Sequence, residues 1–408
     1  MSIREDASRI IEHAIRSALP DAAVRRALES MQPAGRLYAV AVGKAAWQMA
    51  NAASELIGDR LQDGIVITKH GYSGGPIPGF RIFEAGHPVP DEDTYAATDA
   101  VIAMTEPLTE EEEVIFLISG GGSALFEKPL IPPEDLDVLT KELLSCGADI
   151  TEINTMRKRF SAVKGGRFAQ LCSPARIHSV VLSDVLGDRL DTIASGPAYP
   201  DSSTSAEAIA IAEKYNLTLT EKMRSLLNVE TPKTLDNVET AITGSVSILC
   251  ASAAEKCREL GYRPVILTSS LSCTARDAGV FLSNIAQEHY GRGEKLAFLA
   301  GGETVVRLTG TGLGGRNQEL ALAAAPGIRG MENVCVFSVG SDGTDGPTDA
   351  AGGIVDGSTC DALAACGLDV FSVLQENDSY HALEKCGGLL KTGPTGTNVN
   401  DLSVLLLG

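Results

Sequence analysis

The chain is poor in positive charge and has no long apolar run. Its 408 residues include 34 lysines and arginines against 53 aspartates and glutamates, a formal net charge of −19. A negative field of that size disfavours nucleic acid and anionic membranes as partners. No apolar run approaches the ~20 residues that span a bilayer, and the acidic, amphipathic first twenty residues do not resemble a secretory signal peptide. We therefore expect a cytoplasmic protein.

The nine cysteines include no CxxC pair and no cluster with histidine. Their spacing argues against a zinc site and against a disulfide framework. Because they are scattered and mostly lie in apolar segments, we expect reduced cysteines in the core of a cytoplasmic protein. The content of 44% hydrophobic and 21% charged residues suits a soluble globular enzyme, and the length favours two or three domains.

Short β-rich segments alternate with helical periodicity along most of the chain. This alternation predicts an α/β fold whose parallel sheet is covered by helices on both faces, and such sheets bind ligands at the carboxyl ends of their strands. The polar segment 227–243 predicts a boundary, so we expect domains at 1–238 and 239–408. The expected strands are Leu37–Val42, Gly64–Thr68, Arg81–Ala85, Val114–Ser119, Ile177–Ser183, Ser247–Cys250, Pro264–Leu267, Leu296–Ala300, Thr304–Leu308 and Val334–Val339.

Two glycine-containing junctions follow strands in the N-terminal half. Lys44 follows Gly43 and opens a helix, where a helix N-terminus favours anions; an ordinary surface lysine after a turn is the equal alternative. Three glycines, Gly120 to Gly122, lie between Ser119 and Ser123. Consecutive glycines carry an entropic cost unless the backbone needs an unusual φ or a close ligand. We favour an anion cradle here over a plain tight turn.

Four further residues in the N-terminal half are candidates for function. Lys164 and Arg167 flank two glycines and are either ligand contacts or part of a solvated basic helix face. Asp184 follows an expected strand, a usual place for a general base or metal ligand, with capping as the alternative. His87 also follows a strand, but a lone histidine is more typical of a structural role.

The segment Gly301–Gly353 contains two polar, glycine-rich loops. Gly310–Gly315 matches GxGxxG after an expected strand and before a helix, which is the dinucleotide fingerprint. The separation from Gly310 to Asp342 exceeds the ~20 residues usual for the ribose-binding acid. Arg316 and Asn317 instead suit contacts to a phosphoryl or carboxylate group. The second loop holds three aspartates that could bind a metal ion: Asp342, Asp345 and Asp349.

Nine motifs in order, spread from Ala39 to Asp401, closely resemble the glycerate 2-kinase family, also called type II glycerate kinases. The C-terminal part resembles the family's MOFRL domain, with Gly314–Asn317 as the counterpart of its naming motif. The motifs are AVGKAAWQMA, GHPVPDE, LISGGGSALFEKP, INTMRKRFSAVKGGRFA, SDVLGD, SGPAYPD, GGETVVRLTGTGLGGRNQELALA, SDGTDGPTDAAGG and LLKTGPTGTNVNDL.

The resemblance implies ATP-dependent, Mg²⁺-assisted phosphorylation of D-glycerate to 2-phosphoglycerate. It implies an N-terminal Rossmann-like parallel sheet flanked by helices, a C-terminal α/β/α domain with a mixed sheet, and an active site in a cleft between them. A homo-oligomer is possible. Some family members are labelled hydroxypyruvate reductase, so NAD(P)H-dependent reduction of hydroxypyruvate is the alternative; in this chain GxGxxG alone supports it. A non-catalytic sugar-phosphate-binding regulator is a third hypothesis.

The expected roles follow from the motifs and from the chemistry of phosphoryl transfer, which needs charge neutralisation and a positioned hydroxyl. By resemblance, Lys44 and Arg316 are the catalytic basic residues, and Asp184 is the candidate base. Asp342 and Asp345 are expected to hold Mg²⁺. The residues expected to bind substrate or phosphate are Ser119, Gly120, Gly121, Gly122, Ser123, Lys164, Arg167 and Asn317.

Overall fold

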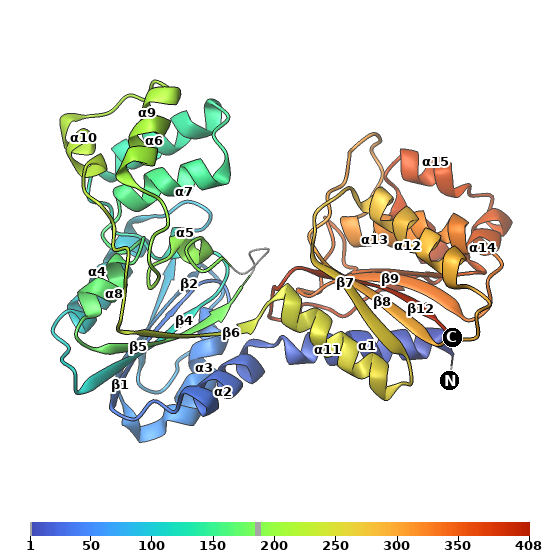
Figure 1. Ribbon diagram of the computed structural model, residues 1–408, viewed down its shortest axis with the longest axis horizontal. Helices are drawn as coiled ribbons and strands as arrows, with labels where there is room; N and C mark the ends of the chain where they lie inside the picture. The colour runs from blue at the N-terminus through green and yellow to red at the C-terminus, as the bar shows by residue number, and fades with distance from the viewer. Residues whose placement is uncertain (1, 184–188) are drawn as a thin grey trace. The chain divides into compact units, whose positions relative to one another are not determined.

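The computed structural model describes residues 2–183 and 189–408, and the chain divides into two compact units (Figure 1). The N-terminal unit comprises Ala23–Thr243. The C-terminal unit comprises Gly244–Gly408 together with the residues up to Ala22. The expectation of two α/β domains is confirmed. The expected division at 238/239 differs from these units because the first helix belongs with the C-terminal unit.

The N-terminal unit is built on a six-stranded sheet in the order β3-β2-β1-β4-β5-β6. The pairings that join β1 through β5 are all parallel, as a Rossmann-like sheet requires. The order reverses between β1 and β4, so the loops after these two strands meet at a topological switch point. The strands are β1 (Arg36–Val42), β2 (Leu61–Lys69), β3 (Phe80–Ala85), β4 (Glu112–Ile118), β5 (Arg176–Leu182) and β6 (Val238–Gly244).

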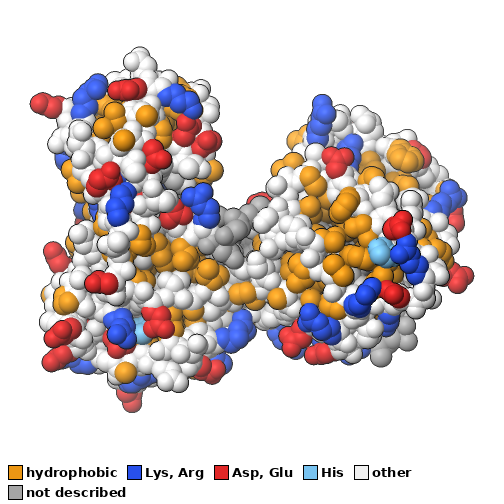
Figure 2. Space-filling model, in the orientation of Figure 1, with side chains coloured by type: hydrophobic (Ala, Val, Ile, Leu, Met, Phe, Trp, Pro, Cys, Tyr) orange, Lys and Arg blue, Asp and Glu red, His pale blue; other side chains and the backbone are white. Residues whose placement is uncertain are grey.

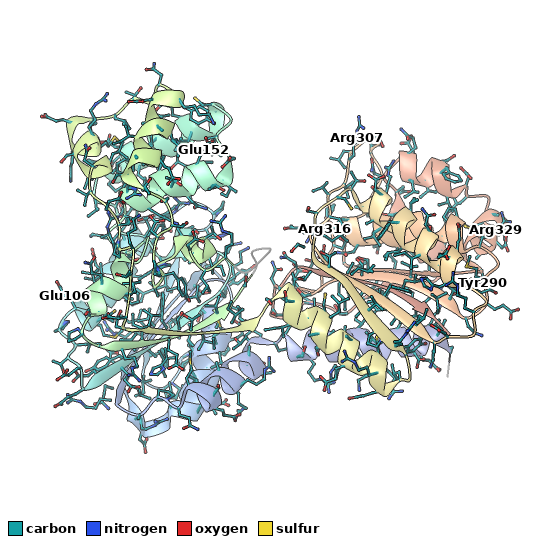
Figure 3. All side chains as sticks on the ribbon, in the orientation of Figure 1. Glu106, Glu152, Tyr290, Arg307, Arg316 and Arg329 are labelled. Carbon is teal, nitrogen blue, oxygen red and sulfur yellow. The ribbon has the colours of Figure 1, made fainter. Side chains whose placement is uncertain are left out.

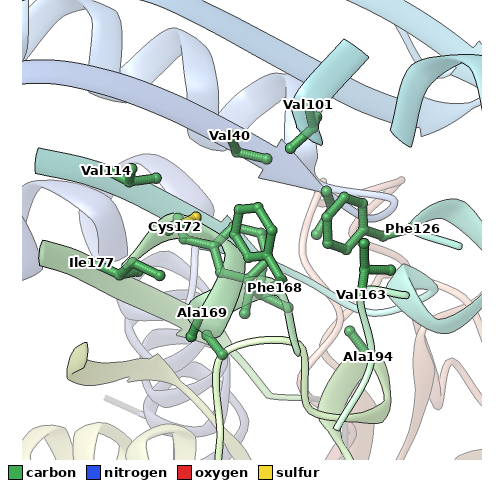
Figure 4. Packing of buried hydrophobic residues seen from close by; sticks show 14 of the residues in the cluster. Val40, Val101, Val114, Phe126, Val163, Phe168, Ala169, Cys172, Ile177 and Ala194 are labelled. Carbon is green, nitrogen blue, oxygen red and sulfur yellow. The ribbon is translucent and has the colours of Figure 1, made fainter. Parts of the chain in front are cut away.

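Helices cover both faces of this sheet because successive strand residues point to opposite sides. Val40 and Val42 pack in one apolar cluster with α4 and α8, whereas Ala39 and Ala41 pack in another with α2 and α3. Phe116, Phe126 and Phe168 form the aromatic centre of the first cluster (Figure 4). The elements are α2 (Pro20–Met31), α3 (Ala46–Ile57), η1 (Gly58–Arg60), α4 (Glu92–Thr105), α5 (Gly122–Leu125), α8 (Arg167–Cys172) and η2 (Ile193–Ser195).

Four helices of the N-terminal unit pack together in a separate small core, α6, α7, α9 and α10. Helix α7 begins with a capping box, in which the Asp149 carboxylate accepts from the backbone N–H of Glu152 and the Glu152 side chain accepts from the backbone of Asp149. This capping fixes the start of the helix that supplies Asn154 and Arg157 described below. The bounds are α6 (Pro133–Ser145), α7 (Ile150–Arg159), α9 (Ser205–Lys214) and α10 (Glu221–Leu227).

The C-terminal unit contains a mixed six-stranded sheet in the order β11-β10-β9-β12-β8-β7. Only the β7–β8 pair among its recorded pairings is parallel, so the expectation of a mixed sheet is confirmed. All residues of β8, β9 and β12 are buried. The strands are β7 (Arg263–Leu271), β8 (Leu296–Gly302), β9 (Val334–Gly340), β10 (Gly352–Asp356), β11 (Leu389–Leu390) and β12 (Asp401–Leu407).

Helices also lie on both sides of the second sheet. Helix α1 buries Ala7, Ile10 and Ile11 and lies beside α11 (Figure 1). The Tyr262 hydroxyl donates to the Asp6 carboxylate at 2.9 Å, which ties this first helix to the unit. The opposite side carries α12 and the helices after β8. The elements are α1 (Ile3–Ser17), α11 (Val246–Glu259), α12 (Ala275–His289), α13 (Arg316–Ala324), η3 (Ala325–Ile328), α14 (Thr359–Ala365), α15 (Val370–Gln375) and α16 (Ser379–Lys385).

Two expected strands are wrong. Residues Ser247–Cys250 lie in α11, because Ser245 caps that helix by accepting from the backbone N–H of Ile248. Residues Thr304–Leu308 form no strand apart from an isolated bridge between Val305 and Thr274. Conversely, the polar segment 227–243, which predicts a domain boundary, contains most of the strand β6.

The surface and the cysteines qualify two other expectations. Cys172, Cys250, Cys257 and Cys335 are buried, but Cys146, Cys273 and Cys366 are exposed, and all nine are free thiols.

In the described ranges, no helix combines the length and apolarity needed to cross a membrane. Figure 2 shows apolar side chains gathered on one face of the C-terminal unit, where the edge strand β7 and helix α12 expose Val265, Ile266, Val280 and Phe281. Homo-oligomerisation stays a prediction.

Candidate active site

The loops after β1 and β4 form one continuous structure at the switch point of the N-terminal sheet. The Lys44 backbone N–H donates to the Gly120 carbonyl at 2.8 Å, and the Ala45 N–H donates to the Ser119 hydroxyl at 3.1 Å. Gly43 has φ +119, and a Cβ there would lie 2.2 Å from Ser119 Oγ. Glycine is therefore required for the two loops to approach each other. Residues that are distant in the sequence meet because parallel strands end at the same edge.

Positive charge borders the glycine loop on one side. A Cβ on Gly121 would lie 3.1 Å from His87 Cδ2 and 3.3 Å from Lys44 Cγ, so both side chains lie against the loop. Burial, followed by the charges of Lys44 and Lys69, lowers the pKa of His87. Across residues 2–183 and 189–408, the Lys44 ammonium group has no ion-pair or hydrogen-bond partner. An unpaired, half-buried cation beside partly exposed glycine backbone suits an anionic ligand.

Two serines, an asparagine and an arginine lie at the end of this loop. The Ser123 and Ser195 hydroxyl oxygens are 3.1 Å apart, and the Ser195 hydroxyl donates to Asn154 Oδ1 at 3.3 Å. One helical turn after Asn154, Arg157 donates from Nη2 to the Ser123 carbonyl at 3.0 Å. Helix α7 therefore contacts the glycine loop directly through Arg157 and indirectly, by way of Ser195, through Asn154.

Lys164 and Arg167 make their bonds inside the protein. Lys164 is fully buried, and its ammonium group donates to the Phe126 carbonyl at 2.7 Å and lies 3.0 Å from Glu127 Oε2. Burial lowers the pKa of Lys164 to about 8, against the opposing charge of Glu127. Arg167 donates to the carbonyls of Lys158 and Ser161. In these contacts both cations bind groups of the protein itself. The ligand contacts expected for Lys164 and Arg167 therefore stay a prediction.

Arg316 begins α13 in the C-terminal unit and is paired with two carboxylates (Figure 3). It binds Asp401 through two nitrogens, at 2.5 and 3.1 Å, and donates to Glu303 at 3.0 Å. Burial opposes its charge, but the bonds to Asp401 outweigh burial and raise the pKa of Arg316. Asn317 is 1% exposed, donates to Asp345 and accepts from the Ser338 hydroxyl. The Asn317 side chain is therefore buried and already bonded to groups of the protein, and the ligand contact expected for it stays a prediction.

The three aspartates of the second C-terminal loop point to different partners. Asp345 is buried and accepts from the backbone N–H groups of Asn317 and Gln318, at 3.1 and 2.9 Å, so it caps α13 from a distant loop. Burial raises the pKa of Asp345 to about 6 against these hydrogen bonds. Asp349 pairs with Lys391 at 2.8 Å. Asp342 is partly exposed and accepts from the Thr344 N–H.

These contacts bear on the expected Mg²⁺ site. Kinases commonly hold Mg²⁺ through one or two carboxylates together with substrate phosphates. Asp342 can supply such an oxygen, whereas Asp345 has hydrogen-bond donors on both oxygens. In the described part of the chain, the group of three side chains whose ligand atoms converge is a different one, His70, Asp91 and Asp93. The residues present therefore fit a metal held by Asp342 and phosphate better than one held by the aspartate pair.

The GxGxxG segment packs against the chain itself. A Cβ on Gly310 would lie 2.4 Å from Glu376 Cα, and one on Gly312 would lie 2.5 Å from Asp378 Cβ. The Gly312 N–H donates to the Glu376 carbonyl at 2.8 Å, and the Gly310 N–H donates to Asn377 Oδ1 at 2.9 Å. The dinucleotide interpretation loses its basis here, because these glycines accommodate another loop and no strand leads directly into them, β8 having ended at Gly302.

Two family models and several known proteins match this chain. The model of a domain of unknown function, DUF4147, matches residues 6–228, and the MOFRL family model matches residues 296–401. The sequence is 51% identical to a D-glycerate 2-kinase of Thermotoga maritima over 100% of this chain and 99% of the relative. The chain belongs to the glycerate 2-kinase family.

Other relatives and a solved structure extend this result. The crystal structure of a glycerate kinase from Thermotoga maritima has a TM-score of 0.96 and covers 99% of each chain at 51% identity. A glycerate 2-kinase of Pyrococcus horikoshii is 40% identical over 100% of this chain and 98% of its own. A putative hydroxypyruvate reductase of Agrobacterium vitis is 37% identical over 100% of this chain and 95% of its own. Both of these glycerate 2-kinases are more similar to this chain than the protein with the reductase name.

The expected site residues fall into four groups. Lys44 and the loop Ser119–Ser123 come together in the N-terminal unit, whereas Arg316 and Asp342 lie in the C-terminal unit. Lys164, Arg167, Asn317 and Asp345 are engaged in internal bonds. Asp184 lies outside the described residues. Sequence reasoning gave no role to Asn154, Arg157 or Ser195 and favoured a structural role for His87, although its place after β3 puts it at the same strand edge.

Proposed function

We propose that the protein transfers the γ-phosphoryl group of ATP to D-glycerate and forms 2-phosphoglycerate and ADP, with Mg²⁺ as the metal ion. The observation that carries the proposal is the unpaired Lys44 ammonium group beside the Gly120–Gly122 backbone at the switch point. Phosphoryl transfer depends mainly on positioning and on neutralising negative charge. Membership of the glycerate 2-kinase family supports the same reaction.

The proposed reaction balances without a further reactant. A glycerate hydroxyl oxygen forms a bond to the γ-phosphorus, the bond from that phosphorus to the β–γ bridging oxygen breaks, and ADP leaves. Asp184 is proposed to take the hydroxyl proton. Lys44 and the Gly120–Ser123 loop are proposed to bind negative charge on the transferred group or the glycerate carboxylate, and Arg316 is proposed as a second neutralising cation. Mg²⁺, when bound to Asp342 and phosphate, would neutralise charge on the nucleotide.

The reductase alternative has lost its sequence support. It depended on GxGxxG, whose glycines contact the segment 376–379. The relatives with reductase names are also less similar to this chain than the glycerate 2-kinases of Thermotoga maritima and Pyrococcus horikoshii. No observation in the site favours hydride transfer over phosphoryl transfer.

One incubation separates the alternatives. The purified protein with D-glycerate and Mg·ATP should produce ADP and 2-phosphoglycerate in equal amounts, with the product's regiochemistry read by ³¹P NMR. Formation of 3-phosphoglycerate would refute the proposed regiochemistry. Absence of ADP, combined with NADH or NADPH oxidation on hydroxypyruvate, would refute the kinase proposal. Glycerate binding without either turnover would favour the regulator hypothesis.

A further inference from the structure

A chain of three polar side chains lies at the Gly120–Ser123 loop and includes its last residue, Ser123. Ser195 is its centre and is fully buried, whereas Ser123 and Asn154 are each partly exposed. Ser195 Oγ lies 3.1 Å from Ser123 Oγ and 3.3 Å from Asn154 Oδ1. All three residues belong to the N-terminal unit. The buried member therefore joins two members that solvent or a ligand can reach.

The direction of these hydrogen bonds follows from counting protons. Each hydroxyl has one proton to donate, and the Ser195 proton is directed to Asn154 Oδ1. The bond between the two serines must then use the Ser123 proton. This leaves the lone pairs of Ser123 Oγ as acceptors and the two N–H groups of the Asn154 amide as donors. Throughout the described residues, no group accepts from that amide nitrogen.

The backbone that presents Ser195 is strained. Ala194 has φ +51 and Ser195 has φ +61, and Gly196 follows at φ +67. Such values are unfavourable for residues with a Cβ and cluster at functional sites. Gly122 lies so close that a Cβ on it would be 2.7 Å from Ala194 Cβ, and Ala194 adjoins the apolar cluster drawn in Figure 4. Packing thus holds the Ser195 hydroxyl at a position that the local sequence alone disfavours.

The exposed groups of this array are neutral and include both donors and acceptors. A hydroxyl group, which donates one proton and accepts others, matches such an array better than an anion does. The cation proposed to bind negative charge, Lys44, lies against Gly121. D-glycerate has a carboxylate, one reacting hydroxyl and one hydroxyl that does not react.

We infer that Asn154 and Ser123 bind the non-reacting hydroxyl of the acceptor substrate, and that Ser195 is a positioning residue that orients both. This inference rests on the proposed function, because it assigns part of the glycerate to this array. A site built to hydrogen-bond a substrate hydroxyl rejects analogues that lack it by large factors, since its polar groups are then left unpaired. The array therefore determines specificity for a dihydroxy acid over a monohydroxy acid.

The test compares D-glycerate with D-lactate, which replaces the C3 hydroxyl by hydrogen. We expect the wild-type protein to prefer D-glycerate by on the order of 10²-fold or more in kcat/KM. In Asn154→Ala and Asn154→Asp the preference should fall at least about tenfold, through a higher KM for D-glycerate with an unchanged KM for ATP. Asp at position 154 can still accept from Ser195, so that variant keeps the packing. Asn228→Asp, an exposed amide in the same unit, is the matched charge control.

Ser195→Gly tests the positioning role, because glycine suits the positive φ while the hydroxyl is removed. We expect it to lower the glycerate-to-lactate preference without lowering the thermal unfolding temperature. An unchanged preference in both folded Asn154 variants would overturn the inference. Calorimetric binding of D-glycerate separates this from failure of the proposed function: if the wild type binds D-glycerate but forms no ADP, the kinase proposal fails, and weaker binding by Asn154→Asp still supports the subsite.

Discussion

The two units each contain a glycine-rich loop that looks like an anion site in the sequence, yet the loops differ in what their glycines contact. In the N-terminal unit, Gly121 lies against the side chains of Lys44 and His87, and Lys44 is unpaired within the described residues. In the C-terminal unit, Gly312 lies against Glu376 and Asp378. A glycine that makes room for a free cation suits a ligand, whereas one that makes room for another chain segment suits packing.

The basic residues next to the loops differ in the same way. Lys44 keeps its charge unmatched, whereas Arg316 is held by Asp401 and Glu303. A cation that is already paired attracts an anionic ligand less strongly than an unpaired cation does, because the ligand must compete with the existing carboxylates. The comparison therefore places the stronger anion attraction in the N-terminal unit, and the following changes test it.

Replacing Lys44 by alanine should have the largest effect. Removing a preorganised charge that stabilises the transferring group should lower kcat by about 10²- to 10³-fold, measured as ADP formation at saturating D-glycerate and ATP. Lys214→Ala is the control, because Lys214 is an exposed lysine of the same unit with its own partner, Glu152, at 2.6 Å. Turnover near the wild-type rate in Lys44→Ala would contradict the conclusion that the stronger anion attraction lies in the N-terminal unit.

Two buried aspartates, one in each unit, should give opposite pH dependences of stability. Burial raises the pKa of Asp345 to about 6, so the unfolded chain loses this proton at lower pH than the folded protein. Stability should therefore fall as pH rises from about 4 to 6, by up to about 3 kcal/mol, and stay reduced above pH 6. Although burial opposes ionisation of Asp201, bonds from Thr231 and Lys158 lower its pKa to about 2, so its contribution is present above pH 4 and is lost toward pH 2.

Urea unfolding of wild type and Asp345→Asn between pH 4 and 7 measures the first effect. The difference in unfolding free energy between the two proteins should shift in favour of the variant as pH rises through this window. A difference that is flat with pH would show that Asp345 titrates normally. Adding Mg²⁺ without nucleotide should leave the difference unchanged if Asp345 caps α13 and binds no metal.

Much of the fold follows from the sequence because strand and helix periodicity are local properties. The meeting of Lys44 with Gly120 could also be predicted, since parallel strands bring their carboxyl ends to one edge. The packing of Gly310 and Gly312 could not, because their contacts at Glu376 and Asp378 are more than sixty residues away in the chain. For the same reason the place of α1 beside α11, and the engagement of Asp345 with α13, required the structure.

A matched pair of glycine substitutions should separate ligand binding from packing. Gly121→Ala places a methyl group against His87 and Lys44 at φ +88, so we expect kcat/KM to fall about tenfold, because a displaced cation binds its anion less well. Gly312→Ala places a methyl group 2.6 Å from the Glu376 carbonyl oxygen, so its main effect should be a lower unfolding temperature. Activity should be measured where both variants remain folded. Equal loss of activity and stability in both variants would contradict the distinction.

The smallest expected effect concerns His87. Burial lowers the pKa of this histidine, and the positive charges of Lys44 and Lys69 lower it further. Lys44→Met removes one charge but keeps most of the side-chain volume, so the pKa of His87 should rise while burial still holds it below the usual range. The ring proton shifts of His87 in an NMR titration measure this change, with Lys214→Met as the control. An unchanged pKa would mean that the Lys44 ammonium group lies farther from the glycine loop than the contacts at Gly121 indicate, and the case for an anion bound between Lys44 and His87 would fail with it.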